Sequence, residues 1–189
     1  MKQRLAHFIS TVGSPVVILL GFTLYTTLQH LQGAAVPICL GTTLVFALVF
    51  IGYMTWQVRS GRIANLDASV RSERQNKVYL PIIGAFGVSL ALFWWLGQTR
   101  LVLVSTACLL LLFVVGFLVT YRLKASLHTA VPCYLGVTAL VSDPAVGLFL
   151  LAITPAIAWS RIVLGRHTLR EVLAGAGIAL LVAAVFYAF

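Results

Sequence analysis

The chain is 189 residues long, and 61% of its residues are hydrophobic while only 9% are charged. A soluble globular domain carries charge on about a quarter of its residues, so this composition excludes that class and favours a chain that lies in a lipid bilayer. The net charge of +9 does not indicate nucleic-acid binding, because the basic residues are confined to short loops between apolar runs, and we expect membrane lipids as partners and no nucleic acid.

Seven apolar runs separated by short polar stretches predict the helices. The runs cover about residues 12–30, 35–57, 78–96, 101–121, 129–142, 145–159 and 170–187. A helix needs roughly 20 residues to cross the hydrocarbon core, and the fifth and sixth runs are short for this, as in a tilted pair or incomplete spans. We predict an all-α fold, a polytopic membrane helical bundle with six or seven transmembrane helices and a single domain over residues 1–189.

Basic residues are sorted to one side of this predicted bundle. If all seven runs cross, the N-terminus and the stretches 57–77, 122–128 and 160–171 share one membrane face, which then carries every Lys and Arg except Arg100. The positive-inside rule explains this sorting and makes the face cytoplasmic. A site for an anionic head group on the same face is a second, compatible explanation. We expect an integral protein of a bacterial cytoplasmic (inner) membrane.

Several other features are expected to be structural. The basic start of the chain resembles a signal peptide, but the run that follows is long, so we expect a retained first helix. Asp143-Pro144 predicts a turn, and the small residues 174–177 predict close helix packing. The three cysteines show neither metal spacing nor a disulfide framework and are expected to be buried: Cys39, Cys108 and Cys133.

The polar stretch 159–171 is the strongest candidate for chemistry. His167 and Glu171 are four residues apart, and on a helix they lie one turn apart on one face, where the carboxylate can hold and polarise the imidazole. Arg161 and Arg166 add fixed positive charge, which suits a phosphate. A carboxylate-supported histidine beside guanidinium groups has the parts needed for nucleophilic attack on phosphorus.

A second polar cluster, residues 122–129, lies where a helix is predicted to start. Backbone N–H groups and the positive end of the helix dipole face an anion at such a place. Ser126 and His128 add a hydroxyl donor and a proton donor there. Two histidines on one membrane face can divide phosphoryl transfer into attack on phosphorus and protonation of the leaving oxygen.

At these residues the chain resembles the type 2 phosphatidic acid phosphatase superfamily of integral membrane lipid phosphatases. The third motif of that family reads Ser-Arg, five residues, His, three residues, Asp. Ser160, Arg161 and His167 match this motif, and Glu171 stands at the Asp position. The resemblance covers mainly the part of the chain from Lys124 onward, together with the overall helical pattern.

The other two family motifs are matched less well. The second motif, Pro-Ser-Gly-His, corresponds to residues 125–128, which keep Ser126 and His128 but have Leu127 in place of Gly. The first motif, Lys, six residues, Arg-Pro, is not found. Glu in place of Asp at 171 adds a methylene that shifts the imidazole by about an ångström and lowers the rate, and Leu127 crowds the backbone beside the phosphate.

The resemblance implies a role for each matching residue. His167 is expected to be the nucleophile that becomes phosphorylated, with Glu171 as its orienting carboxylate. His128 is expected to protonate the leaving group, after which water releases the phosphate. The expected substrate is a lipid phosphate.

Phosphate binding is assigned partly from the resemblance and partly from charge. The resemblance implies that Ser126 and Arg161 bind phosphate oxygens, and Lys124 adds charge in the same cluster. The candidates for the missing first motif, inferred from charge alone, are Arg71, Arg74 and Lys77. The family needs no metal or other cofactor, and the four acidic residues do not form the carboxylate cluster that Mg²⁺ uses.

Three classes of function remain open from the sequence. The first is an enzyme that hydrolyses a phosphomonoester or diphosphate on a lipid, such as an isoprenyl diphosphate or a glycerolipid phosphate. The second is a non-catalytic anionic-lipid binding or transport protein on the same scaffold, and the third is a structural subunit of a membrane complex. The His–Glu spacing favours the enzyme, because binding needs only the arginines. Each of these classes is compatible with a homo-oligomer. Each is also compatible with a site on either face of the membrane.

Overall fold

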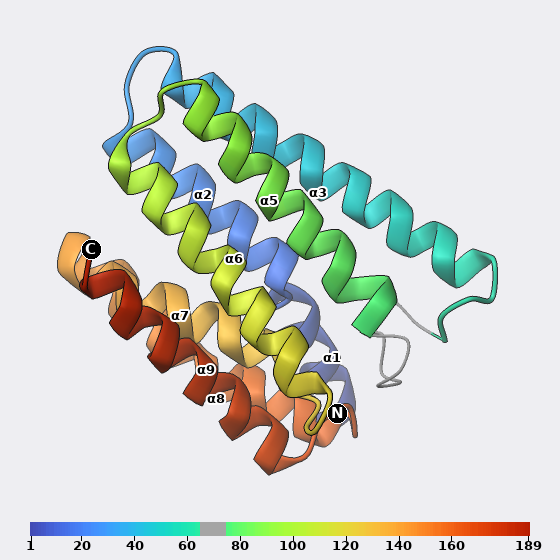
Figure 1. Cartoon of the computed structure of the whole chain (residues 1–189). Coiled ribbons are helices and arrows are strands. Elements are labelled where there is room, and N and C mark those ends of the chain that lie inside the picture. The colour runs from blue at the N-terminus through green and yellow to red at the C-terminus, as the bar shows by residue number, and fades with distance from the viewer. Residues whose placement is uncertain (65–74) are drawn as a thin grey trace. The chain divides into compact units, whose positions relative to one another are not determined.

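The chain is all-α, as predicted, in a computed structural model that describes residues 1–64 and 75–189 (Figure 1). Eight α-helices and one π-helix lie within these residues. They are α1 (Lys2–Val12), α2 (Pro15–His30), α3 (Ala35–Arg59), η1 (Gln75–Tyr79), α5 (Leu80–Trp95), α6 (Arg100–Thr120), α7 (Leu127–Ser142), α8 (Pro144–Val163) and α9 (Leu169–Tyr187).

The helices divide into two compact units. Unit 1 contains residues 1–19 and 118–189, and therefore α1, the start of α2, and α7 to α9. Unit 2 contains residues 20–117, with the rest of α2, α3, η1, α5 and most of α6. Each unit has its own internal packing, and the single domain over residues 1–189 stays a prediction.

Unit 2 is built from long apolar helices. Helix α3 contacts α5, and the rings of Phe86 in α5 and Phe113 in α6 lie 5.1 Å apart between centroids. Met54, Ile63 and Val78 form a buried cluster where α3 ends and η1 begins. This cluster joins the two chain segments that flank residues 65–74.

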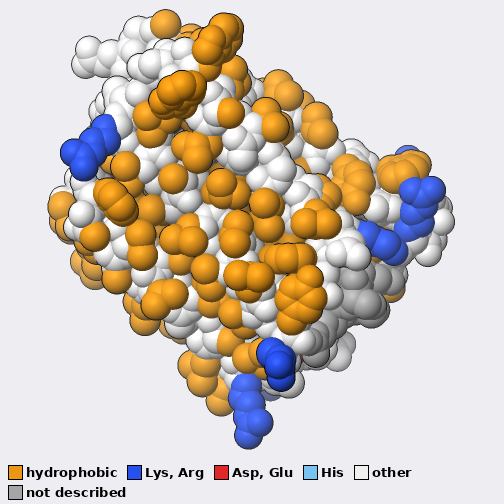
Figure 2. Space-filling model, in the orientation of Figure 1, with side chains coloured by type: hydrophobic (Ala, Val, Ile, Leu, Met, Phe, Trp, Pro, Cys, Tyr) orange, Lys and Arg blue, Asp and Glu red, His pale blue; other side chains and the backbone are white. Residues whose placement is uncertain are grey.

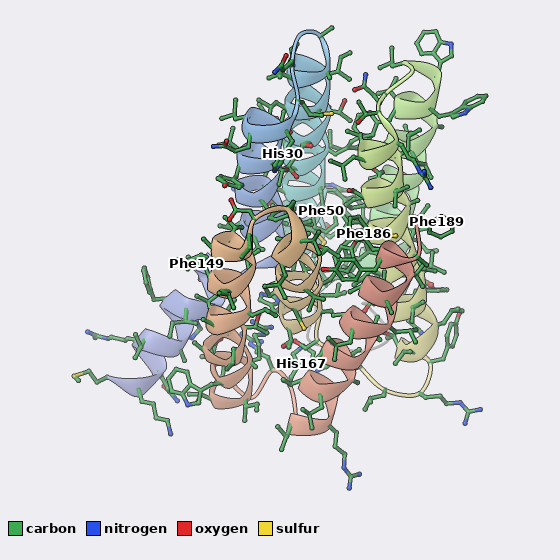
Figure 3. The ribbon with its side chains drawn as sticks, turned by 90° about the vertical axis from the view of Figure 1, so that its left-hand side faces the viewer. His30, Phe50, Phe149, His167, Phe186 and Phe189 are labelled. Carbon is green, nitrogen blue, oxygen red and sulfur yellow. The ribbon has the colours of Figure 1, made fainter. Side chains whose placement is uncertain are left out.

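Unit 1 is organised around α7, in which 12 of 16 residues are buried because α8 and α9 both pack against it. Helices α7 and α8 approach closely at two glycines. A Cβ added at Gly136 would lie 2.9 Å from Leu151 Cγ, and one added at Gly147 would lie 2.9 Å from the Gly136 carbonyl oxygen. Small residues allow backbones to pack this closely. Helix α1 packs against α8, at the end of the unit where His167 lies (Figure 3).

Most of the helices are long and apolar enough to cross a membrane. Five such helices lie within the described residues, and the number is six if α1 and α2 form one bent span. Large apolar side chains on these helices are exposed, and hydrophobic side chains are spread across the face seen in Figure 2. A helix satisfies its own backbone hydrogen bonds, so it tolerates a lipid environment. These helices indicate an integral membrane protein, as the composition predicts.

Most of the expected helix breaks and buried residues agree with the structure. Residues 31–34 lie between α2 and α3, residues 96–99 lie between α5 and α6, and Asp143 separates α7 from α8. All three cysteines are buried. The fifth predicted run corresponds to α7, which is short as expected, at 16 residues.

Two expectations about helices were wrong. The first run is predicted to begin near residue 12, but a separate helix, α1, precedes α2 and meets it at a bend of 46°. The break has a local cause: the Ser14 hydroxyl accepts from Val17 N–H at 3.4 Å, and Pro15 opens α2 because it has no N–H to satisfy. The sixth run is predicted to be short, but α8 continues beyond Trp159 to Val163 and reaches 20 residues.

Asp143 caps the start of α8, so its removal tests this helix boundary. One carboxylate oxygen accepts from Ala145 N–H and from Val146 N–H, both at 3.1 Å. We expect Asp143→Ala to lower the free energy of unfolding by about 1 kcal/mol, measured as a lower melting temperature of the purified protein in detergent. Asp143→Asn keeps an oxygen acceptor and is expected to retain most of the stability. Equal melting of Asp143→Ala and the unsubstituted protein would contradict the capping role.

Candidate active site

The link between α8 and α9 is a tight turn made by main-chain hydrogen bonds. The Arg161 carbonyl oxygen accepts from Arg166 N–H at 3.0 Å and from His167 N–H at 3.2 Å. Gly165 N–H donates to the Ile162 carbonyl oxygen at 3.0 Å. Gly165 has a φ of 65°, a left-handed conformation that glycine adopts without strain. This Schellman-type ending stops α8 and places His167 just before α9.

Glu171 joins His167 to the first turn of α9. Thr168 is the N-cap: its hydroxyl accepts from Glu171 N–H at 3.4 Å, and Glu171 Oε2 accepts from Thr168 N–H at 3.0 Å, which completes a capping box. The same Oε2 lies 3.1 Å from His167 Nδ1. The predicted His–Glu contact is present, but the predicted helical geometry was wrong. His167 precedes the helix, and the contact arises because the cap brings the Glu171 side chain back toward it.

The shared oxygen determines which imidazole nitrogen carries the proton. A carboxylate oxygen only accepts hydrogen bonds, so His167 Nδ1 is the donor in this pair. In the neutral imidazole Nε2 then carries the lone pair. When the ring becomes positively charged, the same carboxylate stabilises that charge. The arrangement therefore suits His167 Nε2 to act as a base or a nucleophile.

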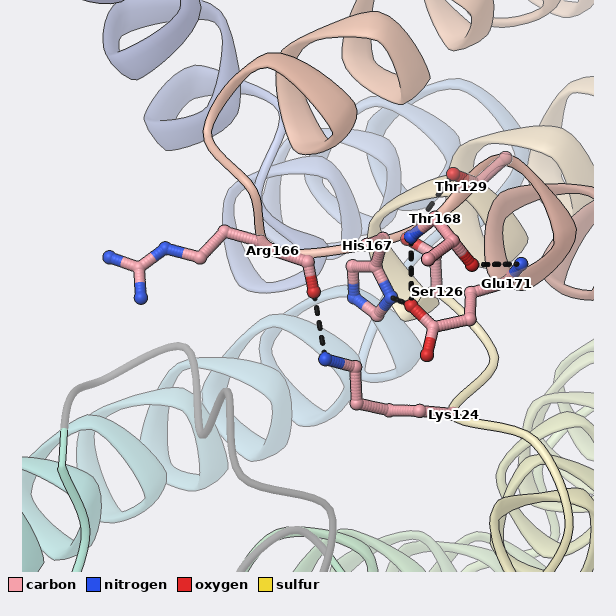
Figure 4. Close-up of polar contacts among 7 residues, drawn as sticks. All are labelled: Lys124, Ser126, Thr129, Arg166, His167, Thr168 and Glu171. Atoms are coloured by element: carbon pink, nitrogen blue, oxygen red, sulfur yellow. Dashed lines mark hydrogen bonds and ion pairs between the residues drawn. The ribbon is translucent and has the colours of Figure 1, made fainter.

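The segment before α7 is tied to the α8–α9 turn by two hydrogen bonds. Ser126 N–H donates to the Glu171 carbonyl oxygen at 3.0 Å, and Lys124 Nζ donates to the Arg166 carbonyl oxygen at 2.8 Å. Figure 4 shows Lys124 reaching this carbonyl beside His167, while the Arg166 side chain extends away from the imidazole. Within unit 1, the stretches 122–128 and 160–171 therefore lie at the same end, as predicted.

Ser126 lies directly against the backbone of α9. A Cβ added at Gly175 would lie 2.4 Å from the Ser126 carbonyl oxygen, a distance that requires the backbone to move. Ser126 is fully buried, and its hydroxyl oxygen accepts from Thr129 Oγ1 at 3.3 Å. The close packing predicted for the small residues 174–177 is thus present at Gly175, and the segment it contacts belongs to the candidate site.

His128 lies in the first turn of α7, for which Ser126 is the N-cap. The helix start predicted in this cluster is confirmed. The first turn of a helix presents backbone N–H groups and the positive end of the dipole. His128 is buried, at 8% exposure. Ser126 and His128 therefore lie at the end of α7 that favours negative charge.

Arg161 is the largest of the fully buried side chains, at 1% exposure. Its Nη1 donates to the Ser10 hydroxyl oxygen, which belongs to α1. A guanidinium group has five N–H donors, and a buried charge of this kind needs hydrogen-bond partners. Helix α1 thus supplies a polar partner to a residue of the candidate site, while the Arg161 main chain supports His167 through the turn.

The His167–Glu171 pair is largely shielded from solvent. The His167 side chain is 2% exposed and the Glu171 side chain is 15% exposed. The same burial keeps water from the imidazole, which strengthens its electrostatic interactions with Glu171.

Three predicted phosphate-binding residues lie outside the described part of unit 1. Arg71 and Arg74 lie outside the described residues. Lys77 belongs to η1 in unit 2, where its ammonium group donates to the Arg62 carbonyl oxygen. Unit 1 contains the other predicted site residues, which are Lys124, Ser126, His128, Arg161, His167 and Glu171.

Ser10 and Thr168 contribute to the site but were not predicted from the sequence. Thr168 had a readable signal, because Thr-x-x-Glu before an apolar run is typical of a capping box. Ser10 lies 151 residues before Arg161, and its pairing has no local sequence pattern.

The fold and the site together define an all-α integral membrane protein with a buried histidine–carboxylate pair at one end of unit 1. In the ranges 1–64 and 75–189, no group of three or more His, Cys, Asp or Glu side chains is placed to hold a metal ion. No protein-family model, curated protein or solved structure matches the chain.

Gly175 and Gly177 offer a matched test of the contact between α9 and Ser126. An added Cβ meets the Ser126 backbone at Gly175 but no heavy atom within 4 Å at Gly177. We expect Gly175→Ala to lower the free energy of unfolding by about 1–3 kcal/mol, because the backbones must separate. Gly177→Ala is expected to be neutral or to stabilise by up to about 1 kcal/mol, because alanine favours the helix.

Melting in detergent measures both effects, and hydrogen exchange at the Ser126 amide reports the contact itself. Exchange at this amide is expected to accelerate in Gly175→Ala alone. The same exchange rate in both variants would show that Gly175 does not hold the loop before α7.

Proposed function

We propose that this protein is a metal-independent membrane lipid phosphatase that hydrolyses a lipid phosphomonoester, or an isoprenyl or glycerolipid diphosphate. The observation that carries the proposal is the 3.1 Å contact between His167 Nδ1 and Glu171 Oε2. This contact orients the imidazole, and with the proton on Nδ1 the lone pair for attack on phosphorus lies on Nε2. A site that only binds anions needs positive charge but no oriented imidazole. The resemblance of residues 160–171 to the third motif of the type 2 phosphatidic acid phosphatase superfamily supports the same reaction.

In the proposed reaction His167 Nε2 donates its lone pair to the phosphorus atom of the substrate. The bond from phosphorus to the leaving oxygen breaks, and that oxygen keeps the electron pair and takes a proton from protonated His128. The first products are the lipid alcohol, or a lipid monophosphate when the substrate is a diphosphate, and a phosphohistidine. Glu171 stabilises the positive imidazole ring in this intermediate.

The second half of the proposed reaction restores the enzyme. Neutral His128 takes a proton from water, and the water oxygen attacks phosphorus. The bond between phosphorus and His167 Nε2 breaks, and inorganic phosphate leaves. His128 is protonated again and His167 regains its lone pair.

Positive charge and helix geometry would hold the phosphate during both steps. Lys124 places an ammonium group beside the α8–α9 turn, through its hydrogen bond to the Arg166 carbonyl oxygen. Ser126 lies at the start of α7, where backbone N–H groups favour an anion. A phosphate role for Arg161 rests on the family resemblance, and its bond to Ser10 fixes the direction of the guanidinium group.

The positive charge of Lys124 beside the start of α7 supports a second candidate, a non-catalytic anionic-lipid binding or transport protein. The Arg161 guanidinium group contributes less to such a site, because at 1% exposure it links α8 to α1. A protein of this class would bind or move lipid phosphates without releasing phosphate, and it would tolerate replacement of His167 by other polar residues. The oriented His167–Glu171 pair favours the phosphatase over this candidate.

For the membrane arrangement, we propose seven crossings in a bacterial cytoplasmic membrane, with α2 and α7 added to the five long helices. Helix α8 begins directly after α7, and the far ends of both helices meet at the candidate site. If α8 crosses, α7 must cross as well. Its 16 residues are enough because α7 is enclosed by protein and does not have to match the lipid thickness.

The central prediction concerns phosphate release. The protein in detergent, with excess chelator, is expected to release phosphate from at least one member of a panel of lipid phosphates and diphosphates. His167→Ala is expected to lose this activity by at least about 10³-fold, because the nucleophile is gone, while its melting temperature stays near that of the unsubstituted protein. Acid-labile labelling by a radioactive phosphate donor is expected in the unsubstituted protein and not in the variant.

Normal turnover by His167→Ala would overturn the proposed mechanism. Lipid binding or translocation without any phosphate release would favour the transport candidate. The chelator inhibits any contaminating metal-dependent phosphatase. Phosphate release in its presence can therefore be assigned to the reaction proposed for this chain.

Glu171→Gln separates the two roles of Glu171. Glutamine at the third helical position still forms a capping box, so melting is expected to change little. The negative charge that stabilises the imidazole ring is lost, and we expect phosphate release to fall by about 10²–10⁴-fold. Glu171→Ala is expected to lose both the activity and about 1 kcal/mol of stability. Full activity in Glu171→Gln would limit this residue to helix capping.

A further inference from the structure

Helix α1 packs against α8 through one narrow side made of small residues. Ala6 is fully buried and Ser10 is 6% exposed. Just beyond the helix, a Cβ added at Gly13 would lie 2.5 Å from Ile157 Cγ1. These positions recur every three or four residues, so they lie on one face of the helix. Because of this close approach, α1 is packed within unit 1 and is not merely an extension of α2.

The rotation of α1 about its own axis is fixed by a polar contact. Ser10 accepts a hydrogen bond from the buried Arg161 guanidinium group. Rotation of the helix would remove this acceptor from a buried charge, which is unfavourable. The faces of α1 that do not touch α8 are therefore set by the fold.

Those remaining faces differ sharply in chemistry. On one side Leu5, Phe8 and Val12 are 53%, 66% and 50% exposed. On the other side lie exposed polar residues, among them Arg4 and His7. The sequence of α1 contains two basic residues and no acidic residue. The helix thus carries an apolar strip, a basic strip that contains Arg4 and His7, and a strip buried in protein, while Lys2 lies in the first turn outside the basic strip.

We propose that α1 lies in the headgroup boundary of the membrane and binds an anionic phospholipid leaflet. The apolar strip would enter the upper part of the acyl chains, and the basic strip would face the headgroups, as in interfacial helices of other membrane proteins. The 46° bend at the junction turns α1 away from the axis of α2, so α1 lies obliquely in the headgroup region while α2 enters the hydrocarbon core. This inference does not depend on the phosphatase reaction.

The charged side chains of α1 favour the headgroup boundary over a position inside the hydrocarbon core. Treated together, α1 and α2 are apolar enough to form one broken span. Exposed Lys2 and Arg4 would then face hydrocarbon, where charged side chains are strongly unfavourable. At the headgroup boundary the same charges are favourable, because the phosphates of anionic lipids are close. The observations therefore favour the membrane surface as the partner of α1.

The experiment places a fluorescent label on each outer strip of α1 in the full chain. Leu5→Cys and His7→Cys are two residues apart and so project to opposite sides of the helix. The three native cysteines are buried, and the unsubstituted protein measures their background labelling. The proteins are reconstituted in phosphatidylcholine vesicles that contain a small fraction of nitroxide-labelled phosphatidylcholine or nitroxide-labelled phosphatidylglycerol, and iodide probes access from water.

The position of α1 is read from which quencher reaches each label. We expect lipid nitroxide near the headgroup end of the chain to quench the label at 5, and iodide to quench the label at 7. Quenching of both labels by nitroxide near the chain end, with no effect of iodide, would show a broken span. Shielding of both labels from all quenchers would show a protein partner. Either of these outcomes would overturn the proposal.

The lipid preference is read from the label at position 5. Labelled phosphatidylglycerol is expected to quench it more than labelled phosphatidylcholine, by roughly fivefold or more, since fivefold is the factor that a single basic residue near an anionic surface provides. Lys2→Gln with Arg4→Gln is expected to bring this ratio to one. Arg100→Gln, which removes a basic residue outside α1, is the matched control and is expected to leave the ratio unchanged. A ratio of one in the parent protein would overturn the anionic preference.

Discussion

One carboxylate oxygen holds the candidate site together. Glu171 Oε2 accepts from the Thr168 main chain and lies within hydrogen-bond distance of the His167 imidazole. The first bond is part of the start of α9, and the second sets the orientation of the ring. Helix initiation and imidazole orientation are therefore inseparable here. Because Ser126 N–H is bound to the Glu171 carbonyl oxygen, the loop before α7 takes its position from the same residue.

The packing around α7 explains how polar groups persist in such an apolar chain. Ser126, His128 and Arg161 are all buried. Hydrogen bonds pair Ser126 N–H with the Glu171 carbonyl oxygen and the Arg161 guanidinium group with the Ser10 hydroxyl oxygen. In an apolar medium, groups without such partners would be strongly unfavourable. The helix ends of unit 1 thus create a small polar region at one end of apolar helices, while Gly136 and Gly147 let α7 and α8 pack closely toward the other end.

The sequence predicted the helical class, most helix positions and the pairing of His167 with Glu171, because hydropathy and spacing are local signals. It failed where a partner comes from far along the chain, as Ser10 does for Arg161. It also failed on the helix that was expected to carry His167, because Gly165 ends α8 before that residue. Glu171 also closes a capping box with Thr168, a local role that a comparison of Glu with Asp at the position of the orienting carboxylate does not reveal.

The turn between α8 and α9 explains why five residues separate Arg161 from His167. The interval is set by main-chain geometry: one residue at the end of the helix offers its carbonyl, one glycine reverses the backbone, and the histidine receives the returning hydrogen bond. Side chains at Ile162 and Leu164 take no part in these bonds, whereas Gly165 does through its backbone. The number of residues in this turn is therefore constrained more tightly than their identity. A single inserted or deleted residue would disrupt the turn more than several substitutions would.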